Sequence, residues 1–297
     1  MKYNKPHTDF DGQVDLLIQR GMIVSNREQA RYYLQHLNYY RLSGYWLPFE
    51  VSRNPHQFAS GTNFEQVIDL YVFDRELRLL VIDAVERIEV SVRTQWAYHL
   101  SEKYGPHAHL DSGLFFKQDK YLATLGKLTG EIARSKEAFI QHLLDAYDET
   151  TPPIWAVVEV MSFGQLSQFY ANLKLRQDRK SIADTYNLDE KVLGSFLHQI
   201  NTIRNACAHH SRLWNRRFTM QMIIPGKRPA GLQQNFNRDQ MVLKKIYNPL
   251  VMLAYLMDRT CPSHHFKTRL KDLLDQHNID EDAMGFPRQW RALPIWN

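Results

Sequence analysis

The stretch FEQVIDLYVFDRELRLLVIDAVERIEVSVRTQWAYHLSEK, residues 64–103, decides the fold class. No glycine or proline interrupts it, and its apolar residues recur every three or four positions. The residues that carry this period are Leu70, Phe73, Leu77, Leu80, Ala84, Ile88 and Val92. Such a period places apolar side chains on one face of an α-helix. Because Thr62-Asn63-Phe64-Glu65 has the spacing of a capping box, we predict one long helix from here to about Lys103.

Shorter helical patterns flank this stretch on both sides. Towards the N-terminus, an apolar run ends at Arg20-Gly21, and Ser25-Asn26-Arg27-Glu28 has capping-box spacing for a further helix. Towards the C-terminus, the patterns predict helices over residues 134–147, 154–161, 162–173, 188–210 and 241–260. The stretches predicted to be loops or rich in loops are 51–63, 105–130 and 221–238. We therefore expect an all-α fold, a helical bundle with additional N-terminal and C-terminal helices.

The length and composition are those of a globular protein with one large core. At 297 residues the chain is near the upper limit for a single domain, so we expect one domain over 1–297, with an N-terminal helical portion (12–60) packed on a helical core (62–260). The stretch Asn38–Trp46 is dense in aromatic residues, which fits a packed helix junction or a base-stacking surface.

The composition also favours certain partners and compartments. The net charge of +5 favours an anionic partner. The two cysteines fit neither a disulfide framework nor a tetrahedral zinc site, which indicates a reducing compartment. No apolar run is long enough to span a bilayer, and the N-terminal residues lack a signal-peptide core. We therefore expect a cytoplasmic protein with no membrane anchor.

The basic window from Asn201 to Met220 contains four arginines, two histidines and no acidic residue. Within it, Asn205 and His209 share one helix face, and Arg204 lies about 140° from His209 around the axis, which a long side chain can bridge. An imidazole can move protons near neutral pH, and a guanidinium can hold a phosphate. The set therefore suits phosphodiester cleavage without a metal or another cofactor. The spacing alone also fits an Asn–His pair hydrogen-bonded within a helix end.

The stretch Arg204-Asn205-Ala206-Cys207-Ala208-His209, with the residues up to Arg216, closely resembles the signature of the Abi-like abortive-infection family (AbiD/AbiF type). That family belongs to the HEPN superfamily, in which an R-x4-6-H motif marks ribonucleases. Further stretches that are similar to the family are Asn38–Trp46, Pro153–Trp155, Ser162–Gly164, Met284–Pro287 and Trp290. The resemblance covers nearly the whole chain.

The resemblance implies a HEPN-type helical bundle and a metal-independent endoribonuclease. Arg204 and His209 match the catalytic positions, and Asn205 matches the polar residue after the arginine. Such enzymes cut RNA by attack of the 2′-oxygen and leave a cyclic phosphate, commonly in a composite site of a homodimer. The implied role is abortive-infection phage defence, or that of a toxin in a toxin–antitoxin pair. The implied partners are RNA, a second copy of the chain and an RNA or protein antitoxin.

Other polar residues have a supporting role or none in this interpretation. We expect His210, Arg212, Arg216 and Arg217 to contact the RNA backbone, although solvated charges would have the same pattern. On the long helix, Glu86, Glu89 and Arg93 form a polar stripe. The stripe fits either ion pairing within the helix or a face that orients Arg204.

Two other groups of residues resemble sites but are interpreted otherwise. Arg93 and His99 also match the R-x4-6-H motif, with five residues between them. We interpret this match as coincidental because the Asn and the basic neighbours are missing. The pairs His107/His109 and His264/His265 are expected at the surface and not as metal ligands.

Two other functions remain open. A non-catalytic RNA-binding or interaction module would keep the same scaffold and the basic surface. A DNA-binding regulator is the third hypothesis, although no clear helix-turn-helix pattern supports it.

Overall fold

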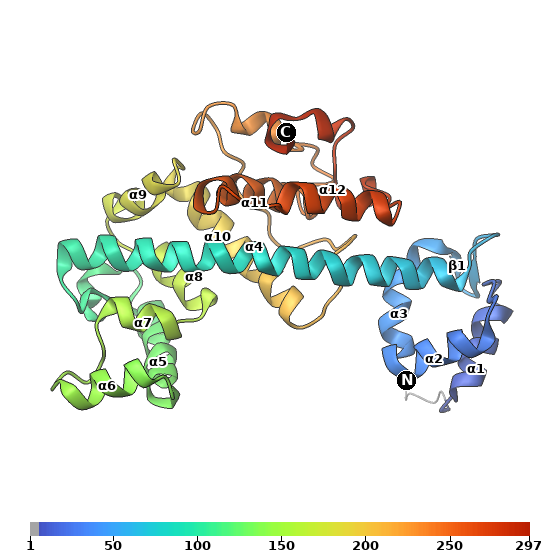
Figure 1. The fold of residues 1–297 in the computed structure, drawn as a ribbon, viewed down its shortest axis with the longest axis horizontal. Helices are drawn as coiled ribbons and strands as arrows, with labels where there is room; N and C mark the ends of the chain where they lie inside the picture. Colours follow the sequence, from blue (N-terminus) through green and yellow to red (C-terminus); the bar gives the residue numbers. More distant parts are fainter. Residues whose placement is uncertain (1–5) are drawn as a thin grey trace. The chain divides into compact units, whose positions relative to one another are not determined.

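The computed structural model describes residues 6–297, which are mostly helical (Figure 1). The α-helices of this part of the chain are α1 (Phe10–Gln19), α2 (Arg27–Leu37), α3 (Tyr39–Trp46), α4 (Phe64–Tyr104), α5 (Gln118–Arg134), α6 (Ala138–Ala146), α7 (Ile154–Val160), α8 (Phe163–Asn172), α9 (Arg176–Thr185), α10 (Glu190–Ala208), α11 (Tyr247–Thr260) and α12 (Phe266–Gln276). The short 3-10 helices are Leu47–Phe49, Ala108–Leu110, Ser112–Leu114, Leu232–Asn235, Asp282–Met284, Trp290–Ala292 and Pro294–Trp296. The predicted all-α class is confirmed.

The chain forms two compact units of opposite charge. The first comprises the residues up to Leu77 and Lys271–Ile279, and the second comprises Arg78–Leu270 and Asp280–Asn297. The described residues of the first unit include seven cationic and eleven anionic side chains, a net charge of −4. The second unit has 28 cationic and 21 anionic side chains, a net charge of +7. The excess of positive charge, and with it the attraction for an anionic partner, therefore lies in the second unit.

Helix starts in the first unit lie one residue later than the capping-box spacing predicted. Asn26 and not Ser25 caps α2, since its side chain accepts a hydrogen bond from the N–H of Gln29. Before α4, Asn63 and Gln66 form the reciprocal side-chain bonds that Thr62 and Glu65 were expected to form. The carbonyl of Thr62 accepts from the N–H of Ile23 and not from a helix N–H, and the isolated bridge in this place joins Ile23 to Asn63.

A hairpin occupies part of the predicted loop at residues 51–63. Strand β1 (Glu50–Arg53) pairs antiparallel with β2 (His56–Phe58), and these form the one sheet of residues 6–297. The hairpin follows the aromatic stretch of α3, in which Tyr45 and Trp46 are buried and the Tyr45 hydroxyl donates to Asp74 at 2.6 Å. Among the aromatic residues of the stretch, only Tyr40 is largely exposed, at 73%. The stretch is therefore mainly a packed junction, and the loop prediction was wrong because the alternation of so short a hairpin is weak.

In the second unit, α5 corrects the loop-rich prediction for 105–130. Its buried residues Tyr121, Thr124, Leu128 and Ile132 recur at helical spacing. Gly126 and Gly130 lie inside the helix and weaken its intrinsic propensity, by about 1 kcal/mol each relative to alanine. Packing against α8 compensates, and there the Thr124 hydroxyl donates to Gln168 at 2.9 Å.

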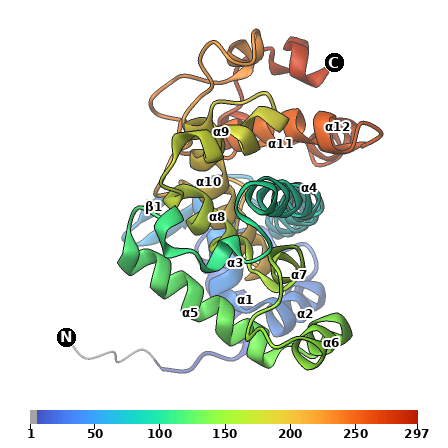
Figure 2. The ribbon, with the colours of Figure 1, turned by 90° about the vertical axis from the view of Figure 1, so that its left-hand side faces the viewer.

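The core of the second unit is built around α10, which packs on α8, α9 and α11. The residues of α11 from Tyr247 to Met257 are all buried, as in a helix surrounded by other elements. Side chains of α4 join this core: Trp96 packs against Phe169 of α8 with tilted rings whose centroids are 5.6 Å apart. Figure 2 looks nearly along α4 and shows α8 and α10 beside it. This arrangement brings the end of α10 near the middle of α4.

The remaining predictions concern the start of α11, membrane-spanning helices and the N-terminal residues. Helix α11 begins at Tyr247 and not at 241, because Pro249 is tolerated only in the first turn of a helix. Within residues 6–297, no helix combines the length and the apolar character that crossing a membrane requires. The prediction about a signal-peptide core falls partly on residues 1–5, which lie outside the described residues.

Candidate functional site

The motif Arg204–His209 forms the C-terminal end of α10. Ala208 is the last helical residue and His209 is the C-cap, whose N–H donates to the carbonyl of Asn205 at 2.9 Å. The next residue, His210, has a φ of +55°, a left-handed conformation that redirects the chain after the helix. Arg204 and Asn205 therefore occupy the last turn, with the imidazole of His209 just beyond it.

The three side chains proposed for chemistry are accessible. Asn205 and His209 are exposed and Arg204 is half-buried, while Ala206 and Cys207 between them are buried. Within the described part of the chain, none of the three side chains forms a hydrogen bond. The structure thus lacks the Asn–His side-chain pair that would explain the motif as a simple helix end. An exposed helix end suits a large substrate such as a polymer.

A buried ion pair of α4 interacts electrostatically with Arg204. Glu89 is 7% exposed, and its carboxylate accepts from the Arg93 guanidinium at 2.5 Å. The same guanidinium donates to the carbonyl of Met161. Burial raises the pKa of Glu89, while the attraction of Arg93 and Arg204 opposes this rise. The opposing effect of Arg204 places its charge within the electrostatic reach of the Glu89 carboxylate.

The three residues of the polar stripe of α4 therefore have different surroundings. Glu89 and Arg93 form the ion pair of the first interpretation, and Glu89 also lies near Arg204, as the second interpretation expects. Glu86 is exposed, and its charge contributes to raising the pKa of Glu89. Within residues 6–297, Glu86 forms no hydrogen bond or ion pair that would orient Arg204.

The segment that enters α8 is the third component of this region. Met161 accepts the hydrogen bond from Arg93, and Ser162 caps α8 in a reciprocal capping box with Gln165. A Cβ atom on Gly164 would lie 3.5 Å from the amide of Asn201, so α8 and α10 approach closely here. Sequence reasoning did not include Asn201. Its position four residues before Asn205, on the same helix face, was the signal that could have identified it.

The basic residues after the motif differ in their surroundings. Arg212 is half-buried, and both His210 and Arg212 interact with other residues. The Arg216 guanidinium lies over the Phe218 ring, 5.8 Å from its centroid, and the exposed Arg217 donates to the carbonyl of Met241 at 3.3 Å. The region without acidic residues extends beyond the window Asn201–Met220 on both sides. No aspartate or glutamate occurs between Glu190 and Asp239.

The surface prediction for the paired histidines was wrong for His109. This residue is 0% exposed in the short turn Ala108–Leu110, and neither ring nitrogen has a hydrogen-bond partner. Burial lowers its pKa to about 4, and the charge of His107 contributes. His264 is also a buried side chain, 2.9 Å from the Asp258 carboxylate, whereas His265 is exposed as predicted.

The remaining candidates do not join the motif. Arg93 is held by Glu89, whereas His99 packs its ring against Tyr98, so the two residues of the R-x5-H match have separate partners. Among residues 6–297, no group of three or more His, Cys, Asp or Glu side chains is placed to hold a metal ion.

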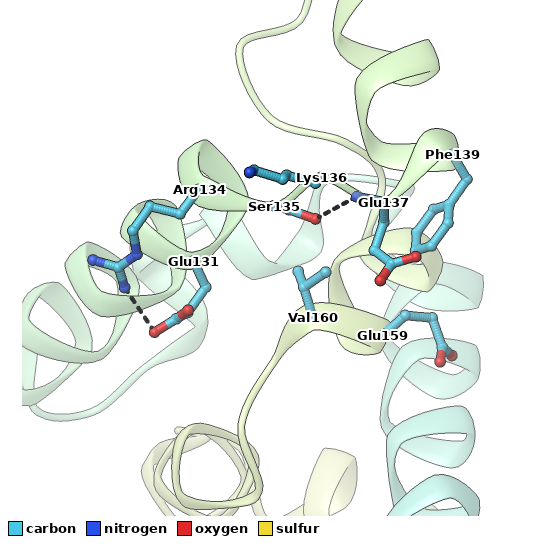
Figure 3. Close-up of a pocket in the computed structure, with 8 residues that line it drawn as sticks. All are labelled: Glu131, Arg134, Ser135, Lys136, Glu137, Phe139, Glu159 and Val160. Atoms are coloured by element: carbon cyan, nitrogen blue, oxygen red, sulfur yellow. Dashed lines mark hydrogen bonds and ion pairs between the residues drawn. The ribbon is translucent and has the colours of Figure 1, made fainter.

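A hollow of about 510 Å³ lies among α5, α6 and α7 (Figure 3). Arg134 and Glu131 pair with each other on one side of it, and Glu137, Phe139 and Glu159 lie on the other side (Figure 3). The charges around it are mixed and exposed. None of its lining residues belongs to the motif or to the ion pair of α4.

Comparisons with known proteins identify a family. The comparisons with curated proteins and with solved structures gave no match. A family model described as Abi-like protein matches residues 32–215, more than half of the chain. The match includes Asn38–Trp46, the segment around Ser162–Gly164 and the motif at the end of α10. The chain therefore belongs to the Abi-like protein family.

Proposed function

We propose that the protein is a metal-independent endoribonuclease that acts through Arg204, Asn205 and His209. Membership in the Abi-like family suggests a role in abortive infection. The proposed setting is phage defence or the toxin of a toxin–antitoxin pair, with an RNA or protein antitoxin as partner. The observation that supports the activity most strongly is the state of the motif: its three accessible side chains form no hydrogen bond within residues 6–297, and they lie at a helix end in the basic unit.

The proposed reaction is an internal transesterification of RNA. His209 takes the proton from a 2′-hydroxyl, and the 2′-oxygen forms a bond to the adjacent phosphorus. The bond from phosphorus to the 5′-oxygen breaks, and that oxygen takes up a proton. The products are a 2′,3′-cyclic phosphate and a 5′-hydroxyl, and no water is consumed. Arg204 stabilises the charge that develops on the phosphate oxygens, and Asn205 positions the substrate.

In this proposal, the ion pair of α4 positions the arginine. The carboxylate of Glu89 attracts the guanidinium of Arg204. Arg93 holds Glu89 in place, because it donates hydrogen bonds both to Glu89 and to the carbonyl of Met161. A positioned guanidinium loses less conformational freedom when it binds a phosphate. Glu89 and Arg93 are thus positioning residues, and Glu86 has no place in the mechanism.

We further propose that two copies of the chain form the complete site. One His209 can supply one of the two proton transfers, and the resemblance to HEPN ribonucleases implies a homodimer in which a second copy supplies the other. Mixing the His209→Ala and Arg204→Ala variants tests this directly. Recovery of cleavage in the mixture supports a shared site, and two inactive variants that stay inactive together contradict it.

The activity is tested by RNA cleavage in excess EDTA. The wild type should produce 2′,3′-cyclic phosphate ends, and His209→Ala and Arg204→Ala should lose the activity. His265→Ala removes another exposed histidine of the same unit and is the matched control. Undiminished cleavage by His209→Ala, or a complete loss of wild-type cleavage in EDTA, would refute the mechanism.

A non-catalytic RNA-binding module is the second candidate. The observation that favours it is the long acid-free region after Glu190, which is basic whether or not the motif is catalytic. In that case His209→Ala should retain both RNA affinity and any effect in cells. The DNA-binding alternative has less support, because the unit with the consecutive helices α2 and α3 has a net charge of −4.

A further inference from the structure

We propose that Arg217 and Lys244 form a second phosphate-binding surface, which holds the RNA backbone next to the motif. The inference rests on the proposed function, because it assigns part of the substrate's path. It adds a segment just before α11 that is remote in sequence from the motif. Neither composition nor motif spacing connects this segment to the site.

Two hydrogen bonds join the two segments. The N–H of Phe218 donates to the carbonyl of Lys244 at 2.8 Å. The Arg217 guanidinium donates to the carbonyl of Met241 at 3.3 Å. Arg217 and Lys244 therefore belong to neighbouring stretches of backbone, although 27 positions separate them in the sequence.

The segment after the motif folds back along α10. The N–H of Ser211 donates to the carbonyl of Ala206 at 2.8 Å, just at the end of the helix. Further along, the N–H of Ile223 donates to the hydroxyl of Ser195 at 2.7 Å, near the start of the helix. Residues between 211 and 223 therefore run beside α10, which places Arg217 on the surface that continues from the motif.

The charges of Arg217 and Lys244 are not neutralised by carboxylates in residues 6–297. Arg217 contacts only a backbone carbonyl, and Lys244 is half-buried without an ion pair. The nearest acidic residue in the sequence, Asp239, accepts from the N–H of Met241 at 2.9 Å. Cations without a counter-ion attract phosphate, and they release condensed counter-ions when they bind it.

Two other nearby cations, Arg228 and Lys245, already have polar partners. We therefore do not include them in the phosphate-binding surface. Arg228 pairs with Asp184 at 2.6 Å and contacts Asn187 at 2.8 Å. The Lys245 ammonium donates to the carbonyl of Ala283 at 2.6 Å. Burial lowers the pKa of Lys245, and repulsion from Arg217 adds to the shift while Asp280 opposes it. The positive field of Arg217 thus extends to this segment, and a bound anion would relieve the repulsion.

The apolar surroundings favour a nucleic acid over a small anion. Met220, Ile223 and Met241 are exposed at 48%, 50% and 68%, and all three lie on the same two segments as the cations. Apolar side chains beside backbone-binding cations can contact the faces of unstacked bases. This combination fits a single strand of RNA, with phosphates on Arg217 and Lys244.

The test measures the salt dependence of binding and not cleavage. All variants are made in the His209→Ala background, and a labelled oligouridylate is titrated at several salt concentrations. The double variant Arg217→Gln, Lys244→Gln should flatten the slope of log Kd against log salt by about 1.4, since each single-strand phosphate contact contributes about 0.7. The matched control is Lys120→Gln, Lys127→Gln, which removes two exposed charges of α5.

The outcomes separate the surface from the activity. An unchanged slope in the double variant, with melting temperatures that match the control, overturns the surface. An equal flattening in the control also overturns it, because the effect is then one of net charge. If poly-glutamate binds with the same dependence on Arg217 and Lys244 and the RNA does not, the surface is for an acidic protein, and the proposal is wrong. The proposed function fails on a different result, the absence of cleavage in EDTA.

Discussion

The buried His109 makes the stability of the protein depend on pH in a defined window. Its ring is 0% exposed, neither nitrogen is hydrogen-bonded, and burial lowers its pKa from 6.5 to about 4. Below pH 6.5 the unfolded chain binds a proton on this ring, whereas the folded protein binds it only near pH 4. Acidification therefore favours unfolding. The free energy of unfolding should fall between these two pH values and change no further through this group outside them.

The size of the effect follows from the shift. A difference of about 2.5 pKa units corresponds to a loss of about 3 kcal/mol, at 1.36 kcal/mol per unit. The variant His109→Leu removes the titrating group and two unsatisfied nitrogens while it fills much of the same volume. Replacing unsatisfied buried polar atoms with apolar ones is neutral or stabilising. The variant should therefore be about as stable as the wild type at pH 7 and about 3 kcal/mol more stable near pH 4.

Urea unfolding, followed by circular dichroism at a series of pH values, measures both predictions. The informative quantity is the difference between variant and wild type, because other groups titrate in both proteins and cancel. His142→Leu, a change of an exposed histidine in the same unit, is the matched control. If the His109→Leu curve runs parallel to that of the wild type from pH 7 to pH 4, the reasoning about the buried ring is refuted.

The remaining predictions concern the site and the backbone. His209→Ala should lower cleavage by about 10²–10⁴-fold, the usual contribution of a general acid or base. Arg204→Ala should lower it by about 10²–10³-fold, the usual contribution of one charge-stabilising donor, while His265→Ala leaves it unchanged in a quantitative gel assay. Glu89→Gln removes the buried charge that faces Arg204 and should lower kcat with little change in KM. It should also cost about 1–3 kcal/mol in thermal unfolding, and unaltered kcat would remove Glu89 from the positioning role. Gly285→Ala should destabilise the protein by about 1–3 kcal/mol, since φ is +89° and a Cβ would lie 3.0 Å from that of Lys245; an unchanged melting temperature would contradict this.

Much of the helical structure could be predicted from local signals. Helices α4 and α10 carry apolar residues at helical spacing over many turns, and Ser162 and Gln165 form a capping box at α8. Such patterns are visible in sequence because the partners of each interaction are close along the chain. Three predictions were wrong for separate reasons: the alternation of the hairpin is too short to recognise, two glycines hide the helical period of α5, and the restriction that Pro249 places on the start of α11 was overlooked.

Some residues of the candidate site could likewise be predicted from the sequence, and others could not. Arg204, Asn205 and His209 were recognised from their spacing and from a family resemblance, and their catalytic roles stay predictions. The sequence left two interpretations of Glu89 open, an ion pair within α4 or a contact that orients Arg204. The structure places the charge of Glu89 near Arg204. Asn201 was missed although its spacing from Asn205 was visible, and its contact with Gly164 appears only in the structure. Lys244 was missed because its contact with Phe218 follows from no spacing rule.

The sequence by itself determined the all-α class, the long helix of residues 64–103 and the position of the motif within an acid-free region. These properties depend on periodicity, capping residues and charge, which act between neighbours in the chain. Only the tertiary structure decided that His109 is buried, that the charge of Glu89 lies near Arg204 and that Arg217 lies beside the Lys244 segment. The physical reason is that burial and electrostatic proximity depend on which distant segments pack together, and the same local pattern is compatible with many such packings.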